Sequence, residues 1–268
     1  MNFKDKIVLI TGGASGIGKI MARKALERGA AKLIIWDINE DGLTAVRHDF
    51  SSYKGEVITY KVDVSDTDMI KTTATKVKNE VGYIDILINN AGVVVGKYFH
   101  EHSHDDIDRS MIINSNAVMH IALEFLPQMM QRNSGAICNI ASSAGLISNP
   151  KMSVYAASKW AATGWSDSLR LEMQQLNKNI SVTTIMPFYI NTGMFDGVKS
   201  KMLPILEPEP TSEKIIRAIE KGTKMLAMPL PYWFIRLSQG IMPISAFDWV
   251  MKNVFGIYDT MKDFKGRK

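Results

Sequence analysis

Short apolar runs alternate with helical patterns through the first 185 residues, and this alternation constrains the fold more than any other feature. The runs lack the period of two that marks a strand with one solvated face, so each is predicted to be a strand buried on both faces. Alternation of buried strands with helices predicts an α/β fold, a doubly wound parallel sheet with helices on both faces. The six runs are Lys6–Ile10, Leu33–Trp36, Glu56–Val62, Ile84–Asn89, Gly135–Ala141 and Ile180–Ile185.

Helical periodicity fills the segments between these runs. After the sixth run the pattern changes, because Pro204, Pro208 and Pro210 interrupt a loop. A short helix is predicted beyond them at Thr211–Gly222, with Ser212 near its N-cap. The longer helices are predicted at Gly16–Arg28, Glu40–Phe50, Thr67–Val81, Asp105–Gln131 and Ser153–Leu176.

Composition and charge exclude several classes of protein. Hydrophobic residues make up 46% of the 268 residues and charged residues 22%, as in ordinary globular proteins. The net charge of +5 is small and scattered, so nucleic-acid binding is not predicted. The one cysteine, Cys138, cannot form an intrachain disulfide and indicates a reducing, cytoplasmic compartment. No stretch is predicted to act as a signal peptide or to span a membrane.

A glycine cluster lies between the first predicted strand and the first predicted helix. It reads TGGASGIG over Thr11–Gly18. Glycine lets the backbone approach a pyrophosphate closely, and the helix that follows offers free N–H groups and the positive end of its dipole. The loop therefore predicts a dinucleotide-binding site.

Asp37 ends the second predicted strand, 19 residues after the last glycine of the loop. A carboxylate at this distance can accept hydrogen bonds from the ribose hydroxyls of the adenosine and would repel a 2′-phosphate. No lysine or arginine lies within Gly12–Gly18 to offset that repulsion. The predicted cofactor is therefore NAD(H), in preference to NADP(H).

Further motifs follow in order along the chain. Asn89–Gly92 reads NNAG after the fourth predicted strand, and Tyr155–Lys159 reads YxxxK within a long predicted helix. Ser142 lies 13 residues before Tyr155. With these motifs and the TGxxxGxG loop, nearly the whole chain resembles the short-chain dehydrogenase/reductases.

The resemblance implies a Rossmann-type sheet of about seven strands in one domain, residues 1–268, and a set of cofactor contacts. One position departs from the family pattern, because Phe188 stands where the family usually has glycine. We expect its ring to shape the substrate cavity.

The implied cofactor-binding residues are Thr11, Gly12, Ser15, Gly16, Ile17, Gly18, Asp37, Asp63, Val64, Asn90, Ala91, Gly92, Tyr155, Lys159, Pro187, Ile190 and Thr192.

The resemblance also implies a catalytic tetrad of Asn114, Ser142, Tyr155 and Lys159. Tyr155 and Lys159 are four residues apart on a helix, so they share one face. A nearby ammonium and the positive nicotinamide ring favour the phenolate and lower the pKa of Tyr155, which can then exchange a proton with the substrate. The implied roles of the others are to hold the substrate oxygen (Ser142), to bind the nicotinamide ribose (Lys159) and to hold a water that links Lys159 to solvent (Asn114).

Two regions after the sixth strand are expected to form the substrate site, a substrate-loop region at 188–222 and an apolar extension at 225–268. The predicted substrate contacts are Ser142, Tyr155, Phe188, Met194 and Phe195.

Residues 225–258 carry few charges, and three roles stay open for them. They could form a subunit interface of a homodimer or homotetramer, a lid over an apolar substrate, or a peripheral contact with a membrane surface. The ending Asp259–Arg267 is similar to that of the retinol/17β-hydroxysteroid dehydrogenase-like subgroup, which acts on retinoids, steroids and other lipidic alcohols.

Two polar segments are predicted to be solvated. His100, His102 and His104 alternate along a predicted loop, where no metal site is expected. Lys262, Lys265, Arg267 and Lys268 form a basic tail, predicted to be a solvated chain end.

These features predict an oxidoreductase that moves a hydride between NAD(H) and the carbinol or carbonyl carbon of a hydrophobic alcohol or ketone. One alternative is a 3-oxoacyl-thioester reductase, which usually uses NADP and is disfavoured by Asp37. A second is a non-catalytic dinucleotide-binding regulator, disfavoured because both Tyr155 and Lys159 are present. The predicted partner is a small apolar substrate, and the predicted location is the cytoplasm, either free or at a membrane surface.

Overall fold

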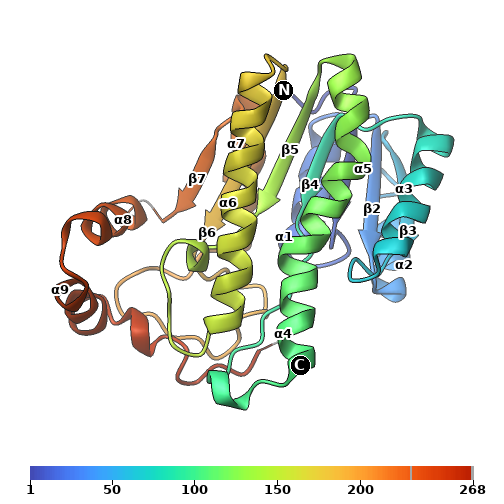
Figure 1. Ribbon diagram of the computed structural model, residues 1–268. Helices are drawn as coiled ribbons and strands as arrows, with labels where there is room; N and C mark the ends of the chain where they lie inside the picture. Colours follow the sequence, from blue (N-terminus) through green and yellow to red (C-terminus); the bar gives the residue numbers. More distant parts are fainter. Residues whose placement is uncertain (230, 267–268) are drawn as a thin grey trace.

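In the computed structural model, which describes residues 1–229 and 231–266, parallel strands form one sheet between two layers of helices (Figure 1). The strand order is β3-β2-β1-β4-β5-β6-β7. The strands are β1 (Ile7–Thr11), β2 (Lys32–Asp37), β3 (Glu56–Lys61), β4 (Ile86–Asn89), β5 (Gly135–Ile140), β6 (Ile180–Pro187) and β7 (Met225–Met228). The helices are α1 (Gly16–Glu27), α2 (Glu40–Asp49), α3 (Thr67–Val81), α4 (His104–Met111), α5 (Ala117–Arg132), α6 (Ser153–Gln175), α7 (Pro208–Lys221), α8 (Pro231–Ile241) and α9 (Ile244–Trp249).

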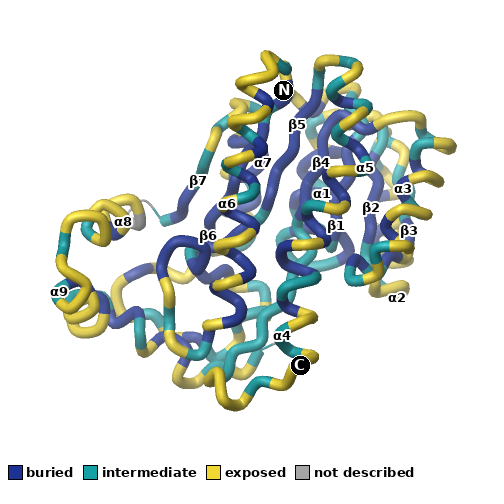
Figure 2. Tube along the Cα trace, in the orientation of Figure 1, coloured by how far each residue is buried: buried dark blue, intermediate teal, exposed yellow. Residues whose placement is uncertain are grey.

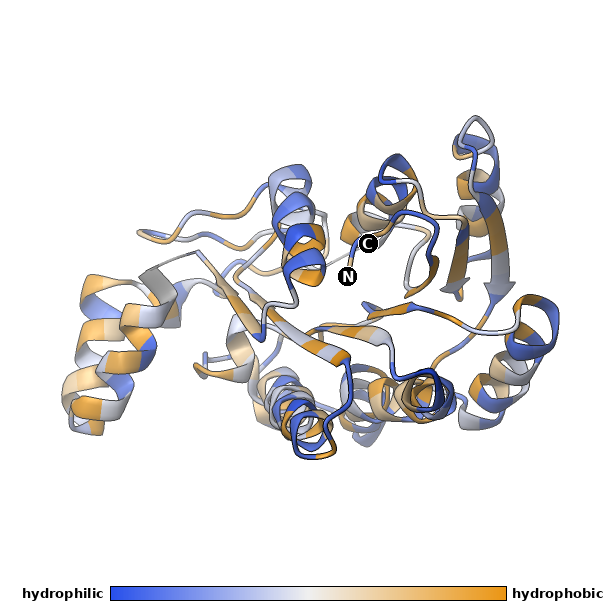
Figure 3. Ribbon diagram, turned by 90° about the horizontal axis from the view of Figure 1, so that it is seen from above, coloured by the Kyte–Doolittle hydropathy of each residue, from blue (hydrophilic) through white to orange (hydrophobic). Residues whose placement is uncertain are grey.

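Alternate residues of the central strand β1 point to opposite faces of the sheet. Val8 and Ile10 belong to a core cluster with α1, α2 and α7, whereas Leu9 belongs to one with α3, α5 and α6. Figure 3 shows the two helical layers from above, with the sheet between them. Because both faces are covered, the strands are apolar at nearly every position, which explains why their sequences lack a period of two.

The predicted α/β fold is confirmed, and each of the six apolar runs is a strand whose ends lie within two residues of the predicted ends. The seventh strand, β7, opens the predicted 225–268 extension, so its four residues belong to the sheet. Residues 230, 267 and 268 of that predicted range lie outside the described residues.

Two predicted helices differ from the structure. Helix α7 begins at Pro208 after Glu207 as its N-cap, so the predicted start at Thr211 is wrong and Ser212 is buried within the helix. Proline suits the first helical position because it has no N–H to leave unpaired and its φ is already helical. The long helix predicted at Asp105–Gln131 is two helices, α4 and α5, joined by the π-helical turn η2 (Ile112–Asn116).

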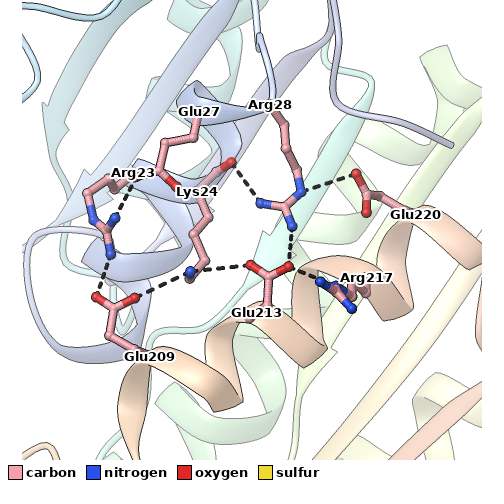
Figure 4. Close-up of polar contacts among 8 residues, drawn as sticks. All are labelled: Arg23, Lys24, Glu27, Arg28, Glu209, Glu213, Arg217 and Glu220. Carbon is pink, nitrogen blue, oxygen red and sulfur yellow. Dashed lines mark hydrogen bonds and ion pairs between the residues drawn. The ribbon is translucent and has the colours of Figure 1, made fainter.

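Charged side chains join α1 to α7 on one face of the sheet (Figure 4). The Glu213 carboxylate accepts hydrogen bonds from Arg28 at 2.6 Å and from Arg217 at 2.8 Å, and Lys24 Nζ lies 3.3 Å from it. Burial alone would raise the pKa of Glu213, but these three cations outweigh it and lower that pKa to about 2. The cluster therefore ties the helix that follows the glycine loop to the helix that follows residues 188–207, called the substrate loop below.

Beyond β7 the chain leaves the sheet as α8 and α9, which project from one side of the molecule (Figures 1 and 2). Ile235 of α8 and Phe247 of α9 are buried in a third core cluster with Tyr155 and Phe188. The C-terminal part of the chain thus builds a wall at the carboxyl ends of the strands. No helix within the two described ranges is long and apolar enough to cross a membrane.

Candidate active site

The glycine loop packs against the turn that follows β4. The Asn90 side-chain amide donates to the carbonyl oxygens of Thr11 and Gly12, each at 3.0 Å. A Cβ atom on Gly18 would lie 2.0 Å from the Gly12 carbonyl oxygen, and Gly12 itself has a φ of +63°. Backbone packing this close requires glycine. The result is a cradle that side chains would fill and that fits a pyrophosphate at the start of α1.

The loop lines a cleft of about 540 Å³. The cleft lies at the carboxyl ends of the strands, where the strand order reverses between β1 and β4. All but two of the predicted site residues line it. Those that do are Gly12, Ser15, Gly16, Ile17, Gly18, Asp37, Asp63, Val64, Asn90, Ala91, Gly92, Ser142, Tyr155, Lys159, Pro187, Phe188, Ile190, Thr192, Met194 and Phe195.

Thr11, one of the two exceptions, lies behind the cleft. It is buried, and its hydroxyl accepts the backbone N–H groups of Asn90 at 3.0 Å and Ala91 at 3.1 Å. Thr11 therefore holds the loop in position from behind the cleft, and its predicted contact with the cofactor stays a prediction.

Asn114, the other exception, lies in the π-helical turn η2 between α4 and α5. Its Oδ1 accepts the Val93 N–H at 2.9 Å, and its Nδ2 donates to the Val93 carbonyl at 2.9 Å and to Ser158 Oγ at 3.0 Å. Ser158 precedes Lys159 on α6, so Asn114 fastens the loop after β4 to the helix that carries the predicted catalytic pair. A π-helical turn inside a helix frequently marks a functional position.

The adenosine end of the cleft is organised by Asp37. Its carboxylate accepts the N–H groups of Ala14 at 2.9 Å and Asn39 at 3.0 Å, which orient it at the end of β2. Ile38, the next residue, is exposed and lines the cleft, so an apolar side chain stands beside this carboxylate.

Twelve further residues line the cleft that were not predicted from the sequence to belong to the site. Most of them are direct neighbours of a motif residue, and that adjacency is the signal that could have identified them. They are Trp36, Ile38, Val62, Ser65, Val93, Asp105, Asp108, Arg109, Ile112, Ile113, Ile140 and Ala141.

Three buried polar side chains meet at the other end of the cleft. Tyr155 and Lys159 lie one turn apart on α6, and Ser142 follows β5. The Ser142 hydroxyl is hydrogen-bonded to the Tyr155 phenol. Lys159 Nζ lies 5.8 Å from the centre of the Tyr155 ring and donates to the Ile140 carbonyl at 2.9 Å. A substrate oxygen placed here would lie beside two hydroxyl groups and near one ammonium.

Burial shifts the pKa values of this pair in opposite directions. It raises the pKa of Tyr155 to about 12, against the smaller effect of the Ser142 hydrogen bond, and it lowers the pKa of Lys159 to about 8. Both shifts disfavour the charged form. The protein by itself therefore opposes the phenolate, and the positive nicotinamide ring of an oxidised dinucleotide is the charge that would favour it.

Phe188 forms part of the wall beside this pair. It is buried, its φ is not positive, and its N–H donates to the Met228 carbonyl of β7 at 2.8 Å. The local backbone therefore does not require glycine. The Phe188 ring lies 4.5 Å from that of Tyr189 and lines the cleft, as expected of a residue that shapes the cavity.

The three alternating histidines do not come together as a cluster. His100 and His102 lie at the short helix η1 (Phe99–Glu101) and its C-cap, and His104 begins α4. Within residues 1–229 and 231–266, no three histidine, cysteine or acidic side chains come together as a metal site.

The fold and the cleft define a nicotinamide-dinucleotide oxidoreductase. Residues 6–203 match the family of short chain dehydrogenases, and the chain belongs to that family. It is an enzyme of the alcohol dehydrogenase/ketone reductase class.

The most similar relatives lie in the predicted subgroup. The chain is 37% identical over 273 residues to "Epidermal retinol dehydrogenase 2" of Mus musculus, with 100% of this chain and 87% of that protein covered. A short chain dehydrogenase/reductase from Burkholderia phymatum, solved in complex with NAD, is 25% identical with a TM-score of 0.81, covering 90% of this chain and 95% of the other. A metagenomic short-chain oxidoreductase, solved with NADP, is 25% identical with a TM-score of 0.71, covering 84% and 96%.

We predict that removal of the buried Tyr155 hydroxyl stops proton transfer without weakening cofactor binding. Tyr155→Phe should lower kcat at least tenfold while the Kd of NADH stays within about threefold, because only the transferable proton is lost. Tyr60→Phe is a matched control, since Tyr60 is also a buried tyrosine whose hydroxyl bonds to Glu80, and it does not line the cleft. Steady-state kinetics and NADH titration measure both quantities. A Tyr155→Phe enzyme with more than about a tenth of the original kcat would reject Tyr155 as the proton donor and acceptor.

Proposed function

We propose that the protein transfers a hydride between a nicotinamide dinucleotide and a hydrophobic alcohol or ketone of retinoid or steroid size. The observation that carries this proposal is the apolar wall of Phe188, Met194 and Phe195 in the same cleft as Ser142 and Tyr155. Apolar walls bind apolar substrates by removing their surface from water, and methionine adapts to irregular shapes. The printed name of the retinol dehydrogenase relative supports the same substrate class.

The proposed roles follow from the arrangement of the three polar side chains. The dinucleotide, held along the glycine loop, supplies the ring carbon that accepts or donates the hydride. Tyr155 takes the proton of the substrate hydroxyl in oxidation and returns it in reduction. Ser142 donates a hydrogen bond to the substrate oxygen and so holds the carbinol carbon in line for transfer. Lys159 binds the nicotinamide ribose and adds positive charge near the phenol, and the water link through Asn114 stays a prediction.

A panel of retinoids, steroids, fatty alcohols and short alcohols tests the proposed substrate class. We expect kcat/KM to favour the large apolar alcohols, and Met194→Ala to raise their KM about fivefold, as expected for about 1 kcal/mol of lost apolar contact. Leu171→Ala, at an exposed apolar residue of α6 outside the cleft, is the control. Formation or loss of NADH absorbance is the measurement. Preference for short alcohols, or turnover of a 3-oxoacyl thioester alone, would contradict the proposal.

We also propose that NAD(H) is preferred to NADP(H). Asp37 supports this, since its carboxylate lies at the adenosine end of the cleft, and the next residue, Ile38, carries no positive charge. A 2′-phosphate at this position would meet the Asp37 carboxylate, and neither Ile38 nor the glycine loop Gly12–Gly18 offers a positive charge to pair with it.

The measured Kd should favour NADH over NADPH by at least about fivefold, because a badly paired charge costs about 1–2 kcal/mol. Asp37→Ala should lower the ratio of the Kd for NADPH to the Kd for NADH. Asp41→Ala, which removes the same charge from the exposed start of α2, should leave that ratio unchanged. Titration by NAD(P)H fluorescence gives all the values. Equal affinities in the unaltered protein would refute the preference.

The outer face of α8 and α9 supports a further part of the proposal, peripheral contact with a lipid surface. Phe234, Leu237 and Ile241 lie on one side of α8 and are 65%, 60% and 73% exposed. Ile244 and Trp249 extend the exposed apolar surface along α9 (Figure 2). Tryptophan and arginine are favoured at membrane interfaces, and the Arg236 guanidinium lies 5.7 Å from the centre of the Trp233 ring. An apolar substrate would be most concentrated in the same lipid phase.

Vesicle flotation tests the lipid contact. The protein should float with vesicles of phosphatidylcholine and phosphatidylserine, and Phe234→Ser with Leu237→Ser should reduce the bound fraction at least fivefold. Leu123→Ser with Leu171→Ser, two exposed leucines on α5 and α6, should leave it unchanged. No flotation of the unaltered protein would overturn the lipid contact. A dimer or tetramer in light scattering that the first pair of changes dissociates would instead assign the face to an interface between copies.

A further inference from the structure

The last described residues, 257–266, here called the strap, run back across the substrate end of the molecule. Figure 1 shows this red segment following the π-helical turn η4 (Val250–Val254) and running across the lower part of the view. The Lys265 N–H donates to the Asp196 carbonyl at 2.9 Å, and the Lys199 N–H donates to the Thr260 carbonyl at 3.2 Å. The Lys262 and Lys265 side chains are exposed, as predicted for a solvated basic tail, whereas the backbone of this segment packs against the substrate loop. Arg267 and Lys268 lie outside the described residues.

Two glycines allow this close contact. A Cβ atom on Gly197 of the substrate loop would lie 2.1 Å from the Asp263 carbonyl oxygen, and one on Gly96 would lie 2.4 Å from the Phe264 ring. The strap therefore packs directly on the backbone of the substrate loop and of the loop after β4. Lys199 Nζ adds an ion pair of 2.7 Å to the Asp263 carboxylate.

Thr260 is the buried polar centre of the strap. Its hydroxyl donates to the Ile257 carbonyl at 2.9 Å and accepts from Asn149 Nδ2 at 2.8 Å, and it lies 3.0 Å from the Tyr189 hydroxyl. One hydroxyl thus joins the strap to the loop after β5 and to the start of the substrate loop. Neither the main cleft nor the small cavity of about 30 Å³ beside Ser142 is lined by Thr260, so this residue does not face the substrate.

A row of aromatic rings leads from Thr260 to the reacting group. The Tyr189 ring meets the Phe195 ring at a centroid distance of 5.0 Å, and the Phe195 ring meets that of Tyr155 at 6.3 Å. Both contacts are edge-to-face, the geometry that aromatic pairs prefer. The position of Phe195 against the catalytic phenol therefore depends on how Tyr189 is held.

We propose that Thr260 is a positioning residue for the substrate wall. Through Tyr189 it keeps Phe195 packed against Tyr155, and with the rest of the strap it holds the substrate loop closed over a bulky apolar substrate. Loss of its hydroxyl would leave the buried Tyr189 and Asn149 donors without this acceptor, which favours a rearrangement of the loop. The proposal rests on the proposed function only for the identity of the substrate.

Thr260→Val removes the hydroxyl and keeps the side-chain shape. We expect at least a fivefold rise in KM for large apolar alcohols, less than a twofold change in KM for short ones, and an unchanged Kd for NADH. Thr260→Ser should restore the original values. Thr184→Val is the matched control, because Thr184 of β6 is also 2% exposed and its hydroxyl bonds to Ser166 of α6 at 2.7 Å, a contact that does not involve the strap.

Hydrogen–deuterium exchange gives a readout that does not need turnover. Amides of residues 193–199 should exchange at least fivefold faster in Thr260→Val and at the original rate in Thr184→Val. If Thr260→Val does not fold, Tyr189→Phe removes the hydroxyl that bonds to Thr260 and keeps the aromatic ring. The same rise in KM for large alcohols and the same faster exchange are then expected. An unchanged KM ratio or unchanged exchange in a folded variant overturns the positioning role. If no alcohol is turned over by the unaltered protein, the proposed function fails. The exchange result alone then decides whether Thr260 positions the substrate loop.

Discussion

The close packing of the glycine loop on the turn after β4 is the contact on which the site depends. The Asn90 amide bonds the carbonyl oxygens of Thr11 and Gly12, and there is no room for a Cβ atom at Gly18. This contact joins β1 to β4 at the point where the strand order reverses, and it opens the cleft between two neighbouring strand ends. Any side chain there would separate the strands or fill the space of a pyrophosphate.

The parallel sheet then decides where the chemistry can lie. All carboxyl ends of the strands meet at one edge, so Ser142 after β5 and Phe188 after β6 reach the same cleft although they are distant in sequence. Helix α6 brings Tyr155 and Lys159 to the same place. The chain after β7 packs behind this edge through Ile235 and Phe247, whereas the apolar wall of the cleft comes from Phe188, Met194 and Phe195.

Burial in that wall has an electrostatic consequence. The pKa of Tyr155 is raised to about 12 and that of Lys159 is lowered to about 8, so burial disfavours the charged form of each group. A site of this kind opposes proton removal until a positive charge is added beside the phenol. The positive ring of an oxidised dinucleotide is such a charge, and this coupling links proton transfer to cofactor binding.

The sequence by itself determined the sheet, most helices, the family and most of the cleft lining, because those features depend on local periodicity and on motifs with fixed spacing. It could not predict the π-helical turn at Asn114, the inward position of Thr11, the start of α7 at Pro208 or the packed strap around Thr260. Proline's preference for the first helical position explains the start of α7, and each of the others is decided by a partner far along the chain. Asn114 meets Val93 and Ser158, and Thr260 meets Asn149, so only the tertiary structure, which brings such pairs within hydrogen-bond distance, could reveal them.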